Sequence, residues 1–335
     1  MLKFTRRAAI ASVAALGLTA SAIPATADSH KMTFTLATSG SETDQRSVAM
    51  ADVFAPMVAE FADYQVGYNG TLFAQGTELE AIAGGNLTMS IASAQELAQF
   101  FPEFSIFATG YVHQDAAHQV RVFNDPLMDP FKKTVEDELG VKLLSVMYLG
   151  RRHVNLRQTR DELDVQTPAD LAGVNLRMPG TDAWQFLGSA LGASPTPLAF
   201  SEVYTSLSSG AIDGQDNPLP TVVDQKFYEV TKQIALTSHL VDLNYIAFSK
   251  EIWDSLAPDQ QLVVQRAADA AAAYGRLKQL DKENNLADFI RSQGVEIYTP
   301  DLEAFRTHVQ AQYVGSEAAE SWPEGVLDKI NALGN

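Results

Sequence analysis

Basic side chains at the predicted ends of two strands are the residues of this sequence best suited to bind a ligand. Arg177 lies in the apolar run 174–178 and is followed closely by Pro179. In an α/β sheet, residues at strand ends line the crevice where ligands bind, and a planar guanidinium can hold a carboxylate by two parallel hydrogen bonds. The pattern leaves a second interpretation open, in which Arg177 pairs with a neighbouring Asp or Glu.

A second basic group follows the predicted strand 141–148. It consists of Arg151, Arg152, His153 and Arg157. His153 is expected to be able to charge near neutral pH, so the group could hold a carboxylate together with another anionic or hydroxyl group. The same residues would also fit a second interpretation, in which they lie at a solvated strand edge and form ion pairs.

Patterns that would indicate catalysis or a bound metal are missing from the sequence. The histidines make no H-x-x-x-H pair, and the glycine and serine motifs of nucleotide-binding enzymes and serine hydrolases do not occur. Residues 213–217 resemble a calcium loop in composition only. We therefore expect no cofactor and no metal.

A lyase would need a base, for which Glu202 and Asp216 are the candidates. The sequence shows neither hydrogen-bond reach to a reacting proton nor the shifted pKa that a base requires.

Composition and charge exclude several classes of protein. The chain has 335 residues, of which 46% are hydrophobic and 19% charged, which is ordinary for a globular protein and long enough for two domains. Acidic residues outnumber basic ones 41 to 24, and this charge opposes binding to nucleic acid or to anionic lipid. The absence of cysteine excludes disulfides, thiolate metal sites and cysteine nucleophiles.

The first 27 residues have the pattern of a cleaved export signal. Lys3, Arg6 and Arg7 precede a small apolar run, and residues 25–27 end in the small-x-small pattern of a cleavage site. The apolar run has about 15 residues, fewer than the roughly 20 that span a bilayer. We expect export to the periplasm by the Sec or the twin-arginine route, and no later membrane-spanning segment.

Hydrophobic periodicity predicts an alternation of strands and helices. The first part of the chain has strands at 32–37, 64–68 and 87–92. Between them lie a helix whose apolar stripe runs over 48–61 and a helix over 77–83, which favours a parallel sheet covered by helices. A helix over 129–139 ending at Gly140 is followed by strands at 141–148 and 152–155. Later elements are predicted at 174–178 (strand), 181–191 (helix), 201–208 (helix), 246–249 (strand) and 251–291 (helix), with a proline-rich link at 194–197 and a loop at 210–220.

Three longer motifs carry a resemblance to a known family. They are TPADLAGVNLRMPG at 167–180, ASPTPLAFSEVYTSLSSGAIDGQDNP at 193–218 and KFYEVTK at 226–232. With these motifs the chain closely resembles the solute receptors of TRAP transporters, of the DctP type, and the sialic-acid-binding receptor is similar across most of the chain after the signal.

The resemblance implies an α/β periplasmic binding protein of two lobes, with a long helix and strands that cross between the lobes. We expect lobe I to comprise 28–149 and about 243–282, and lobe II to comprise 150–242 and about 283–335. A ligand would be enclosed between the lobes and delivered to a membrane permease of two components. The chain is then a receptor without enzymatic activity, and a monomer.

The resemblance also implies roles for single residues. The arginine of the LRMP motif, here Arg177, would grip a ligand carboxylate, Arg152 would be a second arginine of the site, Asn217 would bind the ligand, and Phe200 would be an aromatic wall. His153, Gly180, and the first-lobe residues Glu78 and Ser93 complete the expected site.

The sequence departs from the sialic-acid receptor at several positions. Ser93 and Glu96 stand where that receptor has an acidic residue and an arginine, and Gly180 stands where it has an asparagine after LRMP. We therefore expect a small organic acid other than sialic acid, such as a sugar acid, a dicarboxylate, a sulfonate or an ectoine-like anion. Two further possibilities stay open: a receptor that passes its ligand to a sensor, and a periplasmic lyase.

Overall fold

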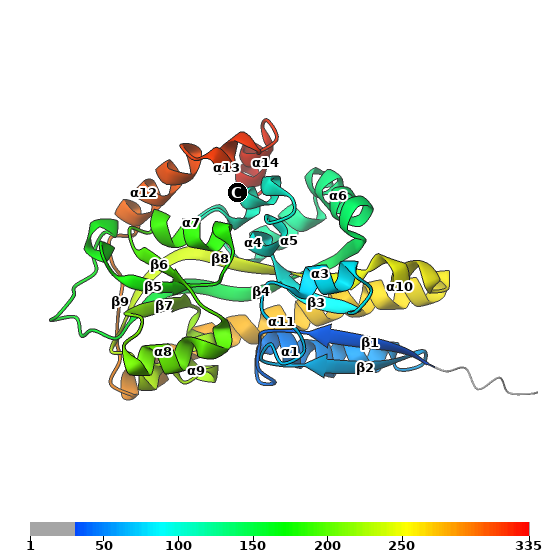
Figure 1. The fold of residues 1–335 in the computed structure, drawn as a ribbon, viewed down its shortest axis with the longest axis horizontal. Coiled ribbons are helices and arrows are strands. Elements are labelled where there is room, and N and C mark those ends of the chain that lie inside the picture. The colour runs from blue at the N-terminus through cyan, green and yellow to red at the C-terminus, as the bar shows by residue number, and fades with distance from the viewer. Residues whose placement is uncertain (1–30, 335) are drawn as a thin grey trace, which may run out of the picture. The chain divides into compact units, whose positions relative to one another are not determined.

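One mixed β-sheet runs through the part of the chain that the structure, a computed structural model, describes, which is residues 31–334 (Figure 1). The strand order is β2-β1-β3-β8-β4-β7-β5-β6, and β9 pairs with β8. The strands are β1 (Met32–Ala37), β2 (Ala62–Gly67), β3 (Met89–Ser93), β4 (Val141–Leu156), β5 (Asn175–Met178), β6 (Ser194–Pro197), β7 (Gly214–Asn217), β8 (Gln233–Ser249) and β9 (Glu296–Tyr298). The expected export signal lies outside the described residues.

The N-terminal half of the sheet has the predicted alternation of strands and helices. Strand β1 pairs in parallel with β2 and with β3. The helix predicted over 48–61 is present as α1 (Gln45–Ala49), a π-helical turn and α2 (Ala55–Val58), and the next one is α3 (Glu78–Ala83). Phe54 and Val58 of the predicted apolar stripe are buried, whereas Met57 is exposed. The prediction of parallel pairing is confirmed for this half.

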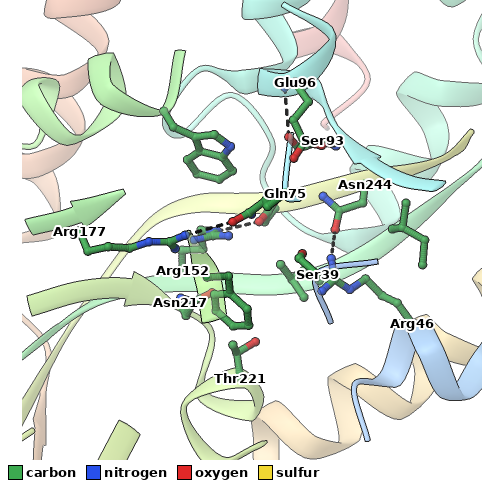
Figure 2. A pocket seen from close by; sticks show the side chains of 15 residues that line it. Ser39, Arg46, Gln75, Ser93, Glu96, Arg152, Arg177, Asn217, Thr221 and Asn244 are labelled. Carbon is green, nitrogen blue, oxygen red and sulfur yellow. Dashed lines mark hydrogen bonds and ion pairs between the residues drawn. The ribbon is translucent and has the colours of Figure 1, made fainter. Parts of the chain in front are cut away.

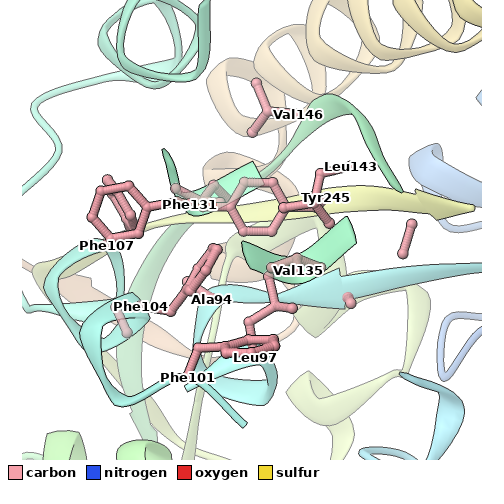
Figure 3. Packing of buried hydrophobic residues seen from close by; sticks show 14 of the residues in the cluster. Ala94, Leu97, Phe101, Phe104, Phe107, Phe131, Val135, Leu143, Val146 and Tyr245 are labelled. Carbon is pink, nitrogen blue, oxygen red and sulfur yellow. The ribbon is translucent and has the colours of Figure 1, made fainter. Parts of the chain in front are cut away.

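Short helices cover one side of this half and form an aromatic core. They are α4 (Ala94–Leu97), the 3₁₀ segment Pro102–Ala108, α5 (Ala116–Asn124) and α6 (Asp129–Leu139). Figure 3 shows Phe104, Phe107 and Phe131 packed beside Tyr245 of β8, with Phe107 and Phe131 edge to face at 4.9 Å between ring centroids. Helix α6 ends at Gly140, which has a φ of 68° as expected for a glycine that terminates a helix.

Two long antiparallel strands connect the halves of the sheet. The C-terminal half of β8 pairs with β3, and its N-terminal end pairs with β9. The C-terminal end of β4 pairs with β7, and β4 and β8 pair with each other along most of their lengths, with three register shifts. The strands predicted at 141–148 and 152–155 are therefore one strand. The crossing strands expected of the two-lobe receptor fold are present.

The second half of the sheet contains two strands where the sequence predicts irregular chain. The proline-rich segment 194–197 is the edge strand β6, paired only with β5, and an edge strand tolerates proline because its outer N–H groups need no partner in the sheet. Part of the loop expected at 210–220 is β7. The helices here are α7 (Asp182–Ala190), α8 (Val203–Ser209) and α9 (Leu219–Asp224), and a 3₁₀ turn (Pro168–Leu171) precedes β5.

The long helix expected over 251–291 consists of two helices, α10 (Lys250–Ser255) and α11 (Pro258–Ser292), because Pro258 starts a new helix. Helix α11 has 35 residues and contacts α1 in one half, β4 in the centre and α9 in the other half. The chain ends with α12 (Leu302–Val314), α13 (Glu317–Glu320) and α14 (Val326–Ala332). Within residues 31–334 none of the helices combines the length and apolar character needed to cross a membrane. The residue boundaries of the two lobes stay a prediction.

Candidate ligand-binding site

A small polar pocket lies where the two halves of the sheet face each other (Figure 2). Its free volume is about 40 Å³, comparable with one or two water molecules. From the N-terminal half come Ser39, Arg46, Gln75, Ile91, Ser93 and Glu96; from the crossing strands Leu149, Arg152, Asp242 and Asn244; and from the second half Arg177, Trp184, Phe200, Asn217 and Thr221.

Arg177 is a buried cation without a carboxylate partner. Its side chain extends from β5, its Nε donates to the Leu198 carbonyl at 2.9 Å, and its Nη2 donates to Oε1 of Gln75 at 3.1 Å. None of the ion pairs among the described residues includes Arg177. Burial lowers the pKa of Arg177 to about 9. A buried charge of this kind is unfavourable until an anion joins it.

Arg152 is held rigidly by two aspartates. Its Nε donates to Oδ2 of Asp242 at 2.6 Å, and its Nη1 donates to the Asp216 carboxylate at 3.1 Å and to the Asp216 carbonyl at 2.8 Å. Its guanidinium lies 4.4 Å from the centroid of the Trp184 ring. Burial opposes the charge of Arg152, but the two carboxylates outweigh burial and keep its pKa above the ordinary value. Arg152 is therefore a fixed positive group in the pocket wall.

Arg46 is a third arginine of the pocket, and the sequence did not single it out. It lies on α1, and Asp44, the residue that caps this helix, binds it by two hydrogen bonds of 3.0 and 2.7 Å. Its Nη1 donates to Oδ1 of Asn244 at 2.5 Å. An Asp-x-Arg pair at a helix start is an ordinary local pattern, so only the fold reveals that Arg46 faces the pocket.

Two carboxylates line the pocket and can accept hydrogen bonds. Oε2 of Glu96 accepts from the Ser93 N–H at 2.7 Å in a capping box at the start of α4. Oδ1 of Asp242 is buried and has no partner, while its Oδ2 is paired with Arg152. Burial raises the pKa of both Glu96 and Asp242. These oxygens suit the hydroxyl groups of a polyhydroxylated ligand.

The structure brings five of the residues predicted for the site together. Arg177, Arg152, Asn217, Phe200 and Ser93 all line the pocket. The Phe200 ring lies 5.6 Å from the Arg177 guanidinium, the position expected of an aromatic wall. Nδ2 of Asn217 donates to Oε1 of Gln215 at 2.5 Å, and this bond orients the amide.

Three other predicted residues do not line the pocket. His153 is buried on β4, where Nδ1 accepts from the Ser238 N–H at 3.2 Å, and burial lowers its pKa to about 3. It is therefore neutral at neutral pH, contrary to the expectation. Glu78 accepts from the Gly76 N–H at 2.6 Å outside the lining, and Gly180 is exposed.

Arg151, expected beside Arg152 in the cleft, contributes to a different cavity. Consecutive residues of a strand point to opposite faces of the sheet, so the two arginines cannot share one site.

The residues proposed as bases of a lyase are poorly placed for that role. Asp216 is fully buried, and although burial alone would raise its pKa, Arg152 and His239 hold the pKa at about 2. Glu202 is exposed and outside the lining. The same described residues contain no group of His, Asp and Glu arranged to hold a metal ion.

The fold and the pocket together define a two-lobe α/β receptor for a small solute. A mixed sheet crossed by two long strands positions three arginines between its halves. Residues 39–319 match the family model for bacterial extracellular solute-binding proteins of family 7, DctP. The chain belongs to this family, whose members are solute-binding receptors.

Curated relatives give the same result. The sialic acid-binding periplasmic protein SiaP of Vibrio cholerae is 28% identical over 255 residues, which are 76% of this chain and 77% of the relative. A solute-binding protein of Roseobacter denitrificans is 30% identical over 251 residues, covering 74% of this chain and 75% of the relative.

Solved structures of TRAP periplasmic solute-binding proteins are similar as well. One from Roseobacter denitrificans, with bound 3-deoxy-D-manno-oct-2-ulosonic acid (KDO), is 77% identical and covers 91% of this chain and 100% of its own, with a TM-score of 0.90. Another from the same organism, with bound L-galactonate, is 25% identical and covers 91% of this chain and 99% of its own, with a TM-score of 0.81.

Proposed function

We propose that this protein is the periplasmic receptor of a TRAP transporter and that it captures KDO or a closely similar ulosonic acid. The observation that carries the proposal is the 77% identity to a TRAP receptor with bound KDO, over 91% of the chain. The pocket supports it, because its three arginines and two carboxylates suit an acid that also carries several hydroxyl groups.

Arg177 is the proposed partner of the ligand carboxylate. Arg46 and Arg152 are already paired with carboxylates of the protein, whereas Arg177 has only neutral acceptors. A ligand carboxylate would offset the cost of burying this charge and can use the guanidinium in a bidentate geometry. Enclosure between Phe200 and the rest of the pocket removes water and strengthens the pair.

The proposed partners of the sugar hydroxyls are acceptors and amides around Arg177. Glu96 and the unpartnered Oδ1 of Asp242 can each accept from a hydroxyl. The amides of Asn217 and Asn244 can both donate and accept. Leaving such buried polar groups unpaired is costly, so this arrangement favours a polyhydroxy acid over a plain aliphatic acid.

Ligand entry requires the pocket to enlarge. A free volume of about 40 Å³ is much smaller than an eight-carbon sugar acid, so the halves of the sheet must move apart and close again. We propose lobe I (28–149 and about 243–282) and lobe II (150–242 and about 283–335) as the moving bodies. Residues 1–27 would direct export, and the closed complex would deliver its ligand to the permease as a monomer without a cofactor.

A thermal-shift screen tests ligand choice. The purified chain from residue 28 is heated with KDO, N-acetylneuraminate, L-galactonate, L-gulonate and uncharged D-glucose. A ligand at a hundred times its Kd stabilises the folded state by about 2.7 kcal/mol. We expect KDO to give the largest shift and glucose to give none. A larger shift with another acid would reassign the ligand, and no shift with any acid would contradict the receptor proposal.

Delivery to a membrane partner needs its own experiment. KDO uptake is measured in cells that carry the cognate permease, with and without this receptor and with the Arg177→Ala variant. Uptake that depends on the unmodified receptor supports the proposal. Uptake that is the same in all three strains contradicts it.

A further inference from the structure

A second polar cavity lies on the opposite face of the crossing strands from the ligand pocket. Its volume is about 510 Å³, within the range of small-molecule sites. Arg151 of β4 faces it, whereas the next residue, Arg152, faces the ligand pocket. Another wall belongs to β8, and the rest come from the loop before α5, from α12 and from α14. Figure 1 places these three helices on one side of the sheet.

Helix α12 presents one row of side chains to this cavity. Leu302, Arg306 and Gln310 are spaced by four residues, so they lie on one face of the helix. The guanidinium of Arg306 lies 5.8 Å from the centroid of the Tyr111 ring. The row therefore brings a cation and an amide towards Arg151.

The charge of the cavity wall is positive. Two arginines line it, and no Asp or Glu is among the described residues that do so. The ion pair between Arg306 and Glu303 is 3.9 Å long and exposed. Nη2 of Arg151 donates only to the Gln114 carbonyl, at 2.6 Å. Glu283 accepts from the backbone N–H of Arg151 and from the Tyr148 hydroxyl.

The imidazole of His113 is buried behind the cavity wall. Its side chain is 3% exposed, and neither ring nitrogen has a hydrogen-bond partner. The neighbouring His118 has both of its nitrogens engaged, with the Gln114 N–H and the Ile330 carbonyl. The ring nitrogens of His113 are covered by the protein itself, so they lie behind the cavity wall and do not face a ligand in it.

Backbone strain is concentrated at the same place. Tyr111 has a φ of 62° and Ser238 a φ of 48°, and both line the cavity. Residues other than glycine adopt this conformation at a cost, and such residues cluster at ligand sites. The two strained residues therefore also support the interpretation that the cavity binds a ligand.

We propose that this cavity is a second binding site, for a small hydroxycarboxylate anion. The carboxylate binds Arg151 and Arg306, and the hydroxyl groups bind the amides of Gln310 and Asn331. The size of the cavity and its apolar residues, Val112 and Leu302, fit an organic anion better than a compact inorganic one. The inference does not depend on which ligand the main pocket takes.

Citrate is a suitable probe, because it is a hydroxycarboxylate with several charges. Its binding is measured by calorimetry on the Arg177→Ala background, which removes the proposed carboxylate grip of the main pocket. We expect one citrate per chain. Replacing Arg151 and Arg306 together by alanine should raise the citrate Kd at least tenfold. Arg266→Ala removes an exposed arginine elsewhere and should leave the Kd within twofold.

A charge reversal keeps the test decisive if the double variant does not fold. Arg306 is exposed enough for Arg306→Glu to leave the fold intact, and this variant should also weaken citrate at least tenfold. KDO binding by the otherwise unmodified protein should not change in either variant. The proposal is overturned if citrate does not bind the Arg177→Ala protein at millimolar concentration, or binds equally well after loss of both arginines.

Discussion

Gln75 and Arg177 meet across the pocket, where Nη2 of Arg177 donates to Oε1 of Gln75 at 3.1 Å. Gln75 belongs to the loop between β2 and α3, and Arg177 belongs to β5 in the other half of the sheet. The amide oxygen of Gln75 therefore occupies a position that a ligand oxygen could take. A ligand carboxylate must displace this amide or share the guanidinium with it.

In the Gln75→Glu variant, the new carboxylate should compete with the ligand carboxylate for Arg177. A carboxylate at the same distance from Arg177 would form a charge-assisted pair, which is stronger than the present neutral acceptor. We expect the KDO Kd to rise at least tenfold. The Tm of the ligand-free protein should rise, by roughly 2 °C for about 1 kcal/mol. Calorimetry and differential scanning fluorimetry measure the two effects.

Gln75→Ala is the matched control for the glutamate variant. It removes the side chain without adding a charge, so KDO affinity should stay within about threefold of the unmodified protein. If the glutamate variant binds KDO as well as the alanine variant does, Arg177 is not the carboxylate partner.

The contribution of Glu78 to the stability of the protein should fall as the pH rises from about 5 to 8. Burial, with a smaller effect of Glu96, raises the pKa of Glu78 to about 8. At Glu78 the folded state then binds a proton that the unfolded state has released, so the contribution of this residue to stability decreases with pH over this interval and levels off above pH 8. Glu78→Gln keeps the neutral form at every pH. We expect this variant to gain at least about 1 kcal/mol over the unmodified protein between pH 5 and pH 8.

Chemical denaturation at pH 5, 6, 7 and 8 measures this difference. Glu80→Gln changes an exposed glutamate of the same helix and serves as the control. Parallel pH profiles for the unmodified and Glu78→Gln proteins would show that Glu78 is already charged at pH 5.

Gly150 is required where β4 crosses between the halves of the sheet. Its φ is 132°, and a Cβ atom there would lie 2.6 Å from the Pro218 Cβ and from Oε1 of Glu283. The backbone conformation alone costs about 1–3 kcal/mol for a residue with a side chain. Gly150→Ala should therefore lower the Tm by several degrees. Gly180→Ala, where an added Cβ meets nothing within 4 Å, should leave the Tm unchanged.

The Gly150→Ala and Gly180→Ala variants are each compared with the unmodified protein by thermal denaturation without ligand. Equal Tm values for Gly150→Ala and the unmodified chain would contradict the steric argument. KDO titration of Gly180→Ala also tests whether Gly180 contributes to the site, as the resemblance implied; with Gly180 outside the pocket lining, we expect no change in Kd.

The fold was predictable wherever apolar periodicity follows the core. The alternation in the first half and the α6–β4 pair have buried residues at regular spacing. Strand β7 has no apolar periodicity, because it consists of Gly214 and the buried polar residues Gln215, Asp216 and Asn217. Polar residues such as Asp242 and Asn244 likewise interrupt the apolar pattern of β8, so only its last four residues were predicted as a strand.

The site was predictable as far as the family motifs extend. These motifs identify Arg177, Phe200 and Asn217, which line the pocket. Arg46 and Gln75 come from the N-terminal half, outside the motifs, and tertiary contacts alone bring them to Arg177. The separation of Arg151 from Arg152 follows from strand alternation, because adjacent residues of a strand face opposite sides of the sheet. The predicted strand at 152–155 was sufficient to expect it.

Calorimetric titration of KDO into the unmodified protein, Arg177→Ala and Arg177→Lys tests the central claim most directly. We predict one KDO per unmodified chain and a loss of roughly 30- to 4000-fold in affinity for Arg177→Ala, corresponding to about 2–5 kcal/mol for a buried charge pair. Arg177→Lys should also bind poorly, because an ammonium lacks the planar fork. Near-normal KDO affinity in a folded Arg177→Ala protein would contradict the account.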